Sequence, residues 1–227
     1  MKMYWISKWV LGFIFIFVWG CSPSGSNDQP FNESRKYGIK SGIVEFAPID
    51  IMGVVTKRTI YFDDYGSTER EETIAKGNIF GLTSESHSIS LVKDGYVYTY
   101  DLHKLENGKD ITSKVVTKAR LVPYMLLSLQ QFSITKEMKK NISYKEEGYE
   151  VVAGFRGNKY SICLNKDFPE SIISGVHYKN VVMKTHLGGV LVIASRFQEN
   201  PQIPTSLFLL PKGYTVHDLD VNNEGNP

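Results

Sequence analysis

Acidic side chains gather in one stretch of the chain, at Asp63, Asp64, Glu69, Glu71 and Glu72. Carboxylates that lie close together can carry out acid–base chemistry or bind calcium. In a strand, however, alternate side chains point to opposite faces, so Glu69 and Glu71 share one face and Glu72 lies on the other. We therefore expect a solvated hairpin whose charges protect an exposed edge strand from unwanted pairing.

The other residues capable of chemistry are scattered. The five histidines have no zinc-binding spacing, so we expect them on strand or loop surfaces. They are His87, His103, His177, His186 and His217. The segment Asp218-Leu-Asp-Val-Asn222 begins like a calcium loop but lacks its glycine and final glutamate. The sequence contains neither a Gly-x-Ser-x-Gly elbow nor a glycine-rich phosphate loop. These observations predict a protein that is not an enzyme and has no metal and no cofactor.

The composition of the 227 residues is that of a globular protein, with 42% hydrophobic and 22% charged residues. These values exclude a disordered or collagen-like chain. The 26 Lys and Arg exceed the 24 Asp and Glu by two, and two of the lysines, Lys2 and Lys8, lie in a leader that we expect to be removed. The mature chain is therefore about neutral, and nucleic acid is excluded as a partner. Two cysteines cannot form a disulfide framework. We expect the second, Cys163, to be a small core residue in a strand.

The first twenty residues have the organisation of a secretory signal. Lys2 and Lys8 precede residues 10–19, which are apolar except for Gly12. That run is too short to span a membrane, which takes about 20 apolar residues. Residues 1–20 are therefore expected to form a leader that directs export.

The end of this leader resembles the lipobox of bacterial lipoproteins, because Gly20 directly precedes Cys21. The resemblance implies that the thiol of Cys21 receives a diacylglycerol and that the leader is cut before it; the alternative is an ordinary secretory cleavage site. Residues 21–36 are small, polar and rich in Pro and Gly, which is typical of a flexible tether. We expect a membrane anchor of two or three acyl chains. The short acidic run associated with surface export is missing, which favours the outer membrane facing the periplasm.

Alternating apolar residues predict nine or ten antiparallel strands in one domain over residues 37–217, followed by a polar disordered tail over residues 218–227. The clearest hairpin turns at Asp94-Gly95. After this turn Tyr96, Tyr98 and Tyr100 alternate with smaller residues and therefore share one face. The predicted strands cover residues 37–46, 49–63, 69–74, 87–92, 96–102, 149–153, 159–164, 179–185, 190–197 and 205–210.

One helix is predicted over residues 121–140. Pro123 suits its first turn, and the lysines near its end suit the helix dipole. Those lysines form a solvated face or meet a partner or lipid headgroup. The apolar stripe of this helix consists of Val122, Met125, Leu126, Leu129 and Phe132.

Burying this stripe requires a sheet that curves around the helix. We therefore expect a mainly β (α+β) fold, an open curved antiparallel half-barrel with one principal helix packed against its concave face. A two-sheet sandwich is the alternative, but it leaves no obvious place for the helix.

Seven short segments together resemble the superfamily of periplasmic lipoprotein carriers and lipoprotein receptors, the LolA/LolB-like proteins, and in particular its relatives of unknown function among envelope lipoproteins. The resemblance extends over residues 37–217. It implies an open half-barrel whose concave apolar face is plugged by helical segments and holds acyl chains. The segments are 39–46 (IKSGIVEF), 57–66 (KRTIYFDDYG), 69–72 (EREE), 148–154 (GYEVVAG), 175–181 (GVHYKNV), 193–200 (IASRFQEN) and 208–214 (FLLPKGY).

The expected function is noncatalytic binding of a hydrophobic ligand or a lipoprotein acyl chain. Apolar side chains line sites of this type. The alternative is a packed core without a cavity, in an adaptor lipoprotein that docks a protein partner. The expected lining residues are Tyr96, Tyr98, Tyr100, Met125, Leu126, Leu129 and Phe132.

Overall fold

The computed structural model describes residues 35–121, 143–163 and 172–220. These residues form one open sheet of fourteen strands, antiparallel except for a single parallel pair. The described helices are two short 3-10 turns, η1 (Asp64–Gly66) and η2 (Thr205–Phe208). The predicted mainly β (α+β) class with a principal helix on a concave face is therefore wrong, because no helix packs against the sheet within the described ranges. The helix predicted over residues 121–140 lies, apart from Leu121, outside them.

The order of the strands in the sheet is β14-β8-β6-β5-β4-β3-β1-β13-β12-β11-β10-β9, with β2 paired to β3 and β7 to β6. Their bounds are β1 Gly42–Phe46, β2 Ile49–Ile51, β3 Val54–Asp63, β4 Thr68–Ile79, β5 Leu82–Lys93, β6 Tyr96–Glu106, β7 Lys109–Asp110, β8 Val115–Arg120, β9 Ser143–Val152, β10 Phe155–Cys163, β11 Ile172–Tyr178, β12 Val181–Leu187, β13 Val190–Glu199 and β14 Thr215–Asp218.

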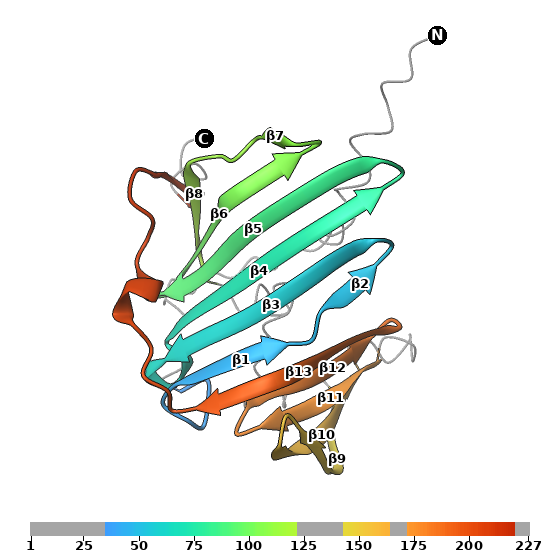
Figure 1. Cartoon of the computed structure of the whole chain (residues 1–227). Coiled ribbons are helices and arrows are strands. Elements are labelled where there is room, and N and C mark those ends of the chain that lie inside the picture. The colour runs from blue at the N-terminus through green and yellow to red at the C-terminus, as the bar shows by residue number, and fades with distance from the viewer. Residues whose placement is uncertain (1–34, 122–142, 164–171, 221–227) are drawn as a thin grey trace, which may run out of the picture.

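Strand β13 joins two parts of the sheet. Its residues 190–193 pair with β12, whereas its residues 194–199 pair with β1. The first half of β13 thus belongs to one part of the sheet and its second half to the other, and the sheet turns at this strand. Figure 1 shows β9–β12 turning away from the broad layer that β3–β6 form.

The main core fills the inside of this bend. Val44, Ile60 and Phe62 lie on one face of β1 and β3, which we call the inner face, and they pack with Val176 and Met183 of the other part. All five are nearly inaccessible to solvent. Within the described residues, side chains of the two parts of the sheet thus pack against each other inside the bend.

Two predictions about strands are corrected. Residues 69–74 form a strand as predicted, but not an exposed edge strand, because they belong to the long interior strand β4, which pairs with β3 and β5. Residues 205–210 begin as η2, where the Leu207 N–H donates to the carbonyl of Pro204. The hairpin at Asp94-Gly95 is confirmed, and both of its turn residues have positive φ.

The predicted tail begins inside the sheet. Asp218 is the last residue of β14, which pairs in parallel with β8. Residues 221–227 lie outside the described ranges, as do the predicted leader over residues 1–20 and the predicted tether as far as residue 34. Among the residues described, no helix is long and apolar enough to cross a bilayer.

Candidate functional site

An apolar cavity of about 160 Å³ lies on the inner face, next to the bend. Alternating residues of β1 and β3 form one wall, since successive side chains in a strand point to opposite faces. Residues of β12 and β13 form the other. The principal lining residues are Val44, Phe46, Ile60, Val181, Val182 and Val192.

One cation lies in the wall of this cavity. Arg58 lines it, and its Nε lies 3.0 Å from Oε1 of Glu71. The Arg58 guanidinium also lies over the ring of Phe46, 4.7 Å from its centroid, where the ring electrons attract the cation. The charge of Arg58 is thus matched within the wall.

A second charged group lies beside the cavity. Glu69 is completely buried and accepts hydrogen bonds from Lys36 Nζ at 2.7 Å and from the Tyr37 hydroxyl at 2.5 Å. Burial, and then the charge of Glu69, raise the pKa of Tyr37 well above its ordinary value. Tyr37 is also a cavity residue. The inner face therefore holds two matched pairs of charges, Lys36 with Glu69 and Arg58 with Glu71.

The prediction of a solvated acidic hairpin is wrong. Register confirms the predicted pleating: Glu69 lies opposite Phe62 and Glu71 opposite Ile60 on the inner face, and Glu72 points outward. The error concerns burial, because β4 is covered on this face by residues 32 or more positions away, such as Tyr37.

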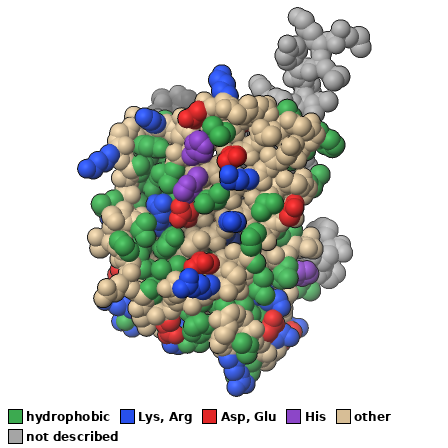
Figure 2. All heavy atoms as spheres, viewed as in Figure 1, with side chains coloured by type: hydrophobic (Ala, Val, Ile, Leu, Met, Phe, Trp, Pro, Cys, Tyr) green, Lys and Arg blue, Asp and Glu red, His purple; other side chains and the backbone are tan. Residues whose placement is uncertain are grey.

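Exposed apolar side chains lie at the β2–β3, β4–β5 and β12–β13 turns, and three of them also line the cavity. Phe80 is 99% and Met52 84% exposed, and both are followed by a glycine in a tight turn. The two turns are neighbours, since the Asn78 N–H donates to the carbonyl of Gly53. We call this set of side chains the apolar rim. The turns that carry it lie at the right-hand side of Figure 1, and Figure 2 shows hydrophobic side chains at the surface on that side. Its residues are Ile51, Met52, Phe80, Leu82, Leu187 and Val190.

The apolar rim and the cavity are continuous. Ile51, Leu187 and Val190 line the cavity and are also 51%, 41% and 36% exposed. The cavity thus opens on the apolar rim at these three residues.

The predicted tyrosines lie on the opposite, outer face. Ile60 is opposite Glu71, Glu71 opposite Ser90 and Ser90 opposite Thr99, so Tyr98 and Tyr100 point away from the cavity. The segment 201–214, which we call the strap, covers them through Ile203, Phe208 and Tyr214. Tyr96 lies 6.3 Å from Tyr98, measured between ring centroids. None of the three predicted tyrosines lines the cavity.

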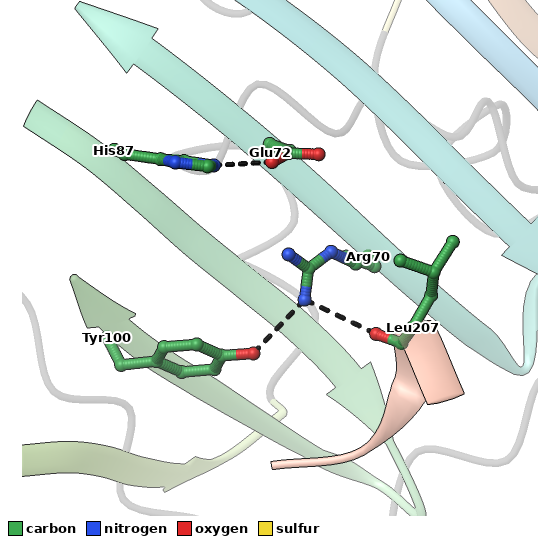
Figure 3. Close-up of polar contacts among 5 residues, drawn as sticks. All are labelled: Arg70, Glu72, His87, Tyr100 and Leu207. Atoms are coloured by element: carbon green, nitrogen blue, oxygen red, sulfur yellow. Dashed lines mark hydrogen bonds and ion pairs between the residues drawn. The ribbon is translucent and has the colours of Figure 1, made fainter. Parts of the chain in front are cut away.

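A buried cation holds the strap against this outer face. Nη1 of Arg70 donates to the Tyr100 hydroxyl at 3.2 Å and to the Leu207 carbonyl at 3.3 Å (Figure 3). Arg70 is only 7% exposed. On the same face, Glu72 pairs with His87 of the neighbouring strand.

The remaining predicted site residues, Cys21, Met125, Leu126, Leu129 and Phe132, lie outside the described residues. Cys163, expected in the core, is half-buried at the end of β10.

Sequence reasoning missed Arg58, and it missed the burial of Glu69, although it singled out that carboxylate. The signal available in the sequence was the spacing of two residues, which places Arg58 on the same face of its strand as Ile60 and Phe62. The sequence did not show that this face points into the core. Within the described residues, no group of three His, Cys, Asp or Glu side chains is arranged to hold a metal ion.

Comparisons with known proteins assign no family. No protein-family model and no curated protein matches the sequence. Similar solved structures include an uncharacterized conserved protein from Thermus thermophilus, at 10% identity and a TM-score of 0.49, over 79% of this chain and 90% of that chain.

Two further matches are weaker. MucB is 12% identical with a TM-score of 0.42, over 81% of this chain and 62% of its own. PNGF-II is 10% identical with a TM-score of 0.38, over 82% of this chain and 32% of its own. The chain thus spans less than two thirds of either protein. These likenesses concern a large β-sheet and give no LolA/LolB assignment.

Proposed function

We propose that this protein is a noncatalytic, lipid-anchored envelope protein that binds the apolar end of an acyl chain. The observation that carries the proposal is the continuity between the exposed apolar rim and the apolar cavity. The sequence resemblance to LolA/LolB-like carriers and receptors points to the same class of ligand. The anchor at Cys21 would hold the domain at a membrane, on the periplasmic side of the outer membrane.

The volume of the cavity limits the ligand. About 160 Å³ is close to the roughly 150 Å³ of an apolar cavity that accepts benzene. The cavity therefore accommodates the last few carbons of one chain rather than several whole chains. Each methylene removed from water contributes about 0.8 kcal/mol, so a few inserted carbons give weak, reversible binding suited to transfer.

The apolar rim favours a lipid surface as the source of the chain. Large exposed apolar patches mark interaction sites, and Phe80 and Met52 project from narrow turns that could enter a headgroup layer. The proposal thus gives the rim and the cavity successive roles, with contact at the membrane followed by uptake of a chain end.

Titration calorimetry of the processed protein with laurate tests the cavity. Val192→Phe fills the cavity and should abolish binding. Val55→Phe is the matched control, because Val55 is a 39% exposed residue of β3 that does not line the cavity. Laurate binding that survives Val192→Phe, or is absent from the unmodified protein, would contradict the proposal. In the second case the adaptor alternative would be favoured.

Tryptophan fluorescence tests the rim. All three tryptophans of the sequence lie in residues 1–19, so Phe80→Trp gives a processed chain with one reporter. Its emission should shift to the blue with phosphatidylethanolamine/phosphatidylglycerol vesicles and be quenched by brominated lipid. Val151→Trp, at a 64% exposed site on β9, should not respond. Equal responses of the two reporters would exclude a specific role for the rim.

Radiolabelled palmitate tests the anchor. The unmodified chain should incorporate the label in a bacterial host, and Cys21→Ala should not. Incorporation into Cys21→Ala would place the acyl group elsewhere.

A further inference from the structure

A polar hollow of about 380 Å³ lies on β9–β11 and on the turn at Lys179-Asn180, and none of its residues lines the apolar cavity. Its lining includes one carboxylate, two cations, two amides and a histidine. A Cβ at Gly157 would lie 2.6 Å from the His177 carbonyl oxygen, so the glycine lets β10 and β11 lie close together here. The residues that the argument uses are Glu146, Arg156, Asn158, His177 and Lys179.

A hydrogen-bonded network holds the carboxylate in place. Tyr144 donates its hydroxyl hydrogen to Oε1 of Glu146 at 2.7 Å, and the Asn158 amide donates to Oε2 at 3.3 Å. The Tyr144 hydroxyl also lies 3.1 Å from Nε2 of His177. Asn158 and His177 are direct cross-strand partners and therefore share this face.

His177 is only 5% exposed, so its predicted surface position is wrong. A buried histidine, a tyrosine and a carboxylate in one network fix the orientation of the Glu146 side chain, which is itself 41% exposed. A fixed acceptor that reaches solvent is preorganised for a ligand that donates hydrogen bonds.

The two cations of the hollow are already engaged. Lys179 pairs with Glu199 at 2.5 Å, and the Arg156 guanidinium lies over the Tyr149 ring, 4.3 Å from its centroid. Stacking of this kind occupies the flat face of a guanidinium and leaves its N–H edge available for hydrogen bonds. The hollow thus offers donors and an acceptor side by side, with no large excess of either charge.

Charge considerations select the ligand class. A phosphate in this hollow would meet the Glu146 carboxylate, and a metal ion would meet Arg156 and Lys179. A sugar hydroxyl both donates and accepts without carrying a net charge. We propose that the hollow binds a neutral carbohydrate of one or two pyranose rings, which its volume accommodates. This second site is independent of acyl-chain binding.

The test is a titration of the isotopically labelled, processed protein with methyl glucoside and with N-acetylglucosamine, followed by NMR. At least one sugar should shift the amide signals of residues 146, 158 and 177 saturably, with a Kd of about 1 mM, as expected for a few contacts on an open surface. Glu146→Gln and Arg156→Ala should each weaken this binding at least about tenfold, or roughly 1.4 kcal/mol.

Glu147→Gln is the matched control, because Glu147 is the exposed neighbour on the same strand and does not line the hollow. It should bind the sugar like the unmodified protein. Glycine and inorganic phosphate are titrated in parallel. The proposal is overturned if neither sugar shifts these signals, if Glu147→Gln weakens binding equally, or if only glycine or phosphate binds. Laurate binding is measured on the same samples, so failure at one site is distinguishable from failure at the other.

Discussion

The two faces of strand β4 hold their buried charges in different ways. On the inner face, Glu69 is bound by Lys36, and Glu71 by Arg58, so each carboxylate has a cation as its partner. On the outer face, Arg70 is almost as deeply buried. It donates instead to neutral groups, a tyrosine hydroxyl and a backbone carbonyl of the strap.

This difference separates two uses of a buried charge. Removing one partner from a buried ion pair leaves the other charge uncompensated, which is strongly destabilising. A cation bound to neutral acceptors loses hydrogen bonds when it is replaced, but it leaves no opposite charge behind. The inner pairs therefore support the cavity wall, whereas Arg70 fastens the strap. The following substitutions test this distinction.

The largest effect is expected for Glu69→Ala. It leaves Lys36 without its partner in a nearly closed environment and should lower the free energy of unfolding by about 3–5 kcal/mol, measured by urea denaturation. Glu72→Ala, whose partner His87 is 30% exposed, should cost about 1 kcal/mol or less. Equal losses would mean that the two faces of β4 do not differ.

A smaller effect is expected for Arg70→Met, which removes two charge-assisted hydrogen bonds and should cost about 1.5–3 kcal/mol. The loss should be local: the Leu207 and Leu209 amides of the strap should exchange hydrogen faster, while amides of β1 should not. Tyr100→Phe, which removes one of the two acceptors, should show a weaker form of the same pattern. Uniform acceleration across the sheet would argue against a local fastening.

The pH dependence of the free energy of unfolding tests the burial of Tyr37 on the inner face. Burial and Glu69 raise the pKa of Tyr37, so the folded protein retains this proton above the pH at which the unfolded chain loses it. The stabilisation is complete below the unfolded pKa of about 10 and is lost as the pH rises further. The free energy of unfolding should therefore decline less steeply above about pH 10 in Tyr37→Phe than in the unmodified protein. Parallel alkaline profiles would contradict this linkage.

The smallest effect is expected at the surface. Lys76 and Glu85 form an ion pair at 2.8 Å, but their side chains are 64% and 43% exposed. Water screens such a pair and the two long side chains lose freedom, so Lys76→Ala should leave the urea midpoint unchanged within error. A clear decrease of the urea midpoint would show that this exposed ion pair of the outer face contributes more to stability than its exposure indicates.

The carboxylates of β4 show how far sequence reasoning reached. Alternation correctly separated Glu69 and Glu71 from Glu72, because pleating is a property of the strand itself. It could not reveal that Glu69 is buried, because the covering residue Tyr37 lies 32 positions earlier in the chain. The tyrosine row has the same explanation, since its shared face was predictable but the strap that covers it was not.

Local backbone preferences determined the hairpins. Asp94-Gly95 turns the chain between β5 and β6 as predicted. Two residues that adopt positive φ are sufficient to form such a turn, and no contact with distant parts of the chain is needed. The export leader and the candidate lipid site at Cys21 are likewise properties of a continuous segment, and they stay predictions.

Tertiary structure alone decided where the apolar surfaces meet. The cavity exists because β13 serves two parts of the sheet in succession, which brings Ile60 close to Val182 and Val192. Ile60 is separated from these valines by more than 120 positions. Contacts over such distances depend on which strands pair, here β3 with β1, β1 with β13 and β13 with β12. The pattern in each strand shows only which residues share a face.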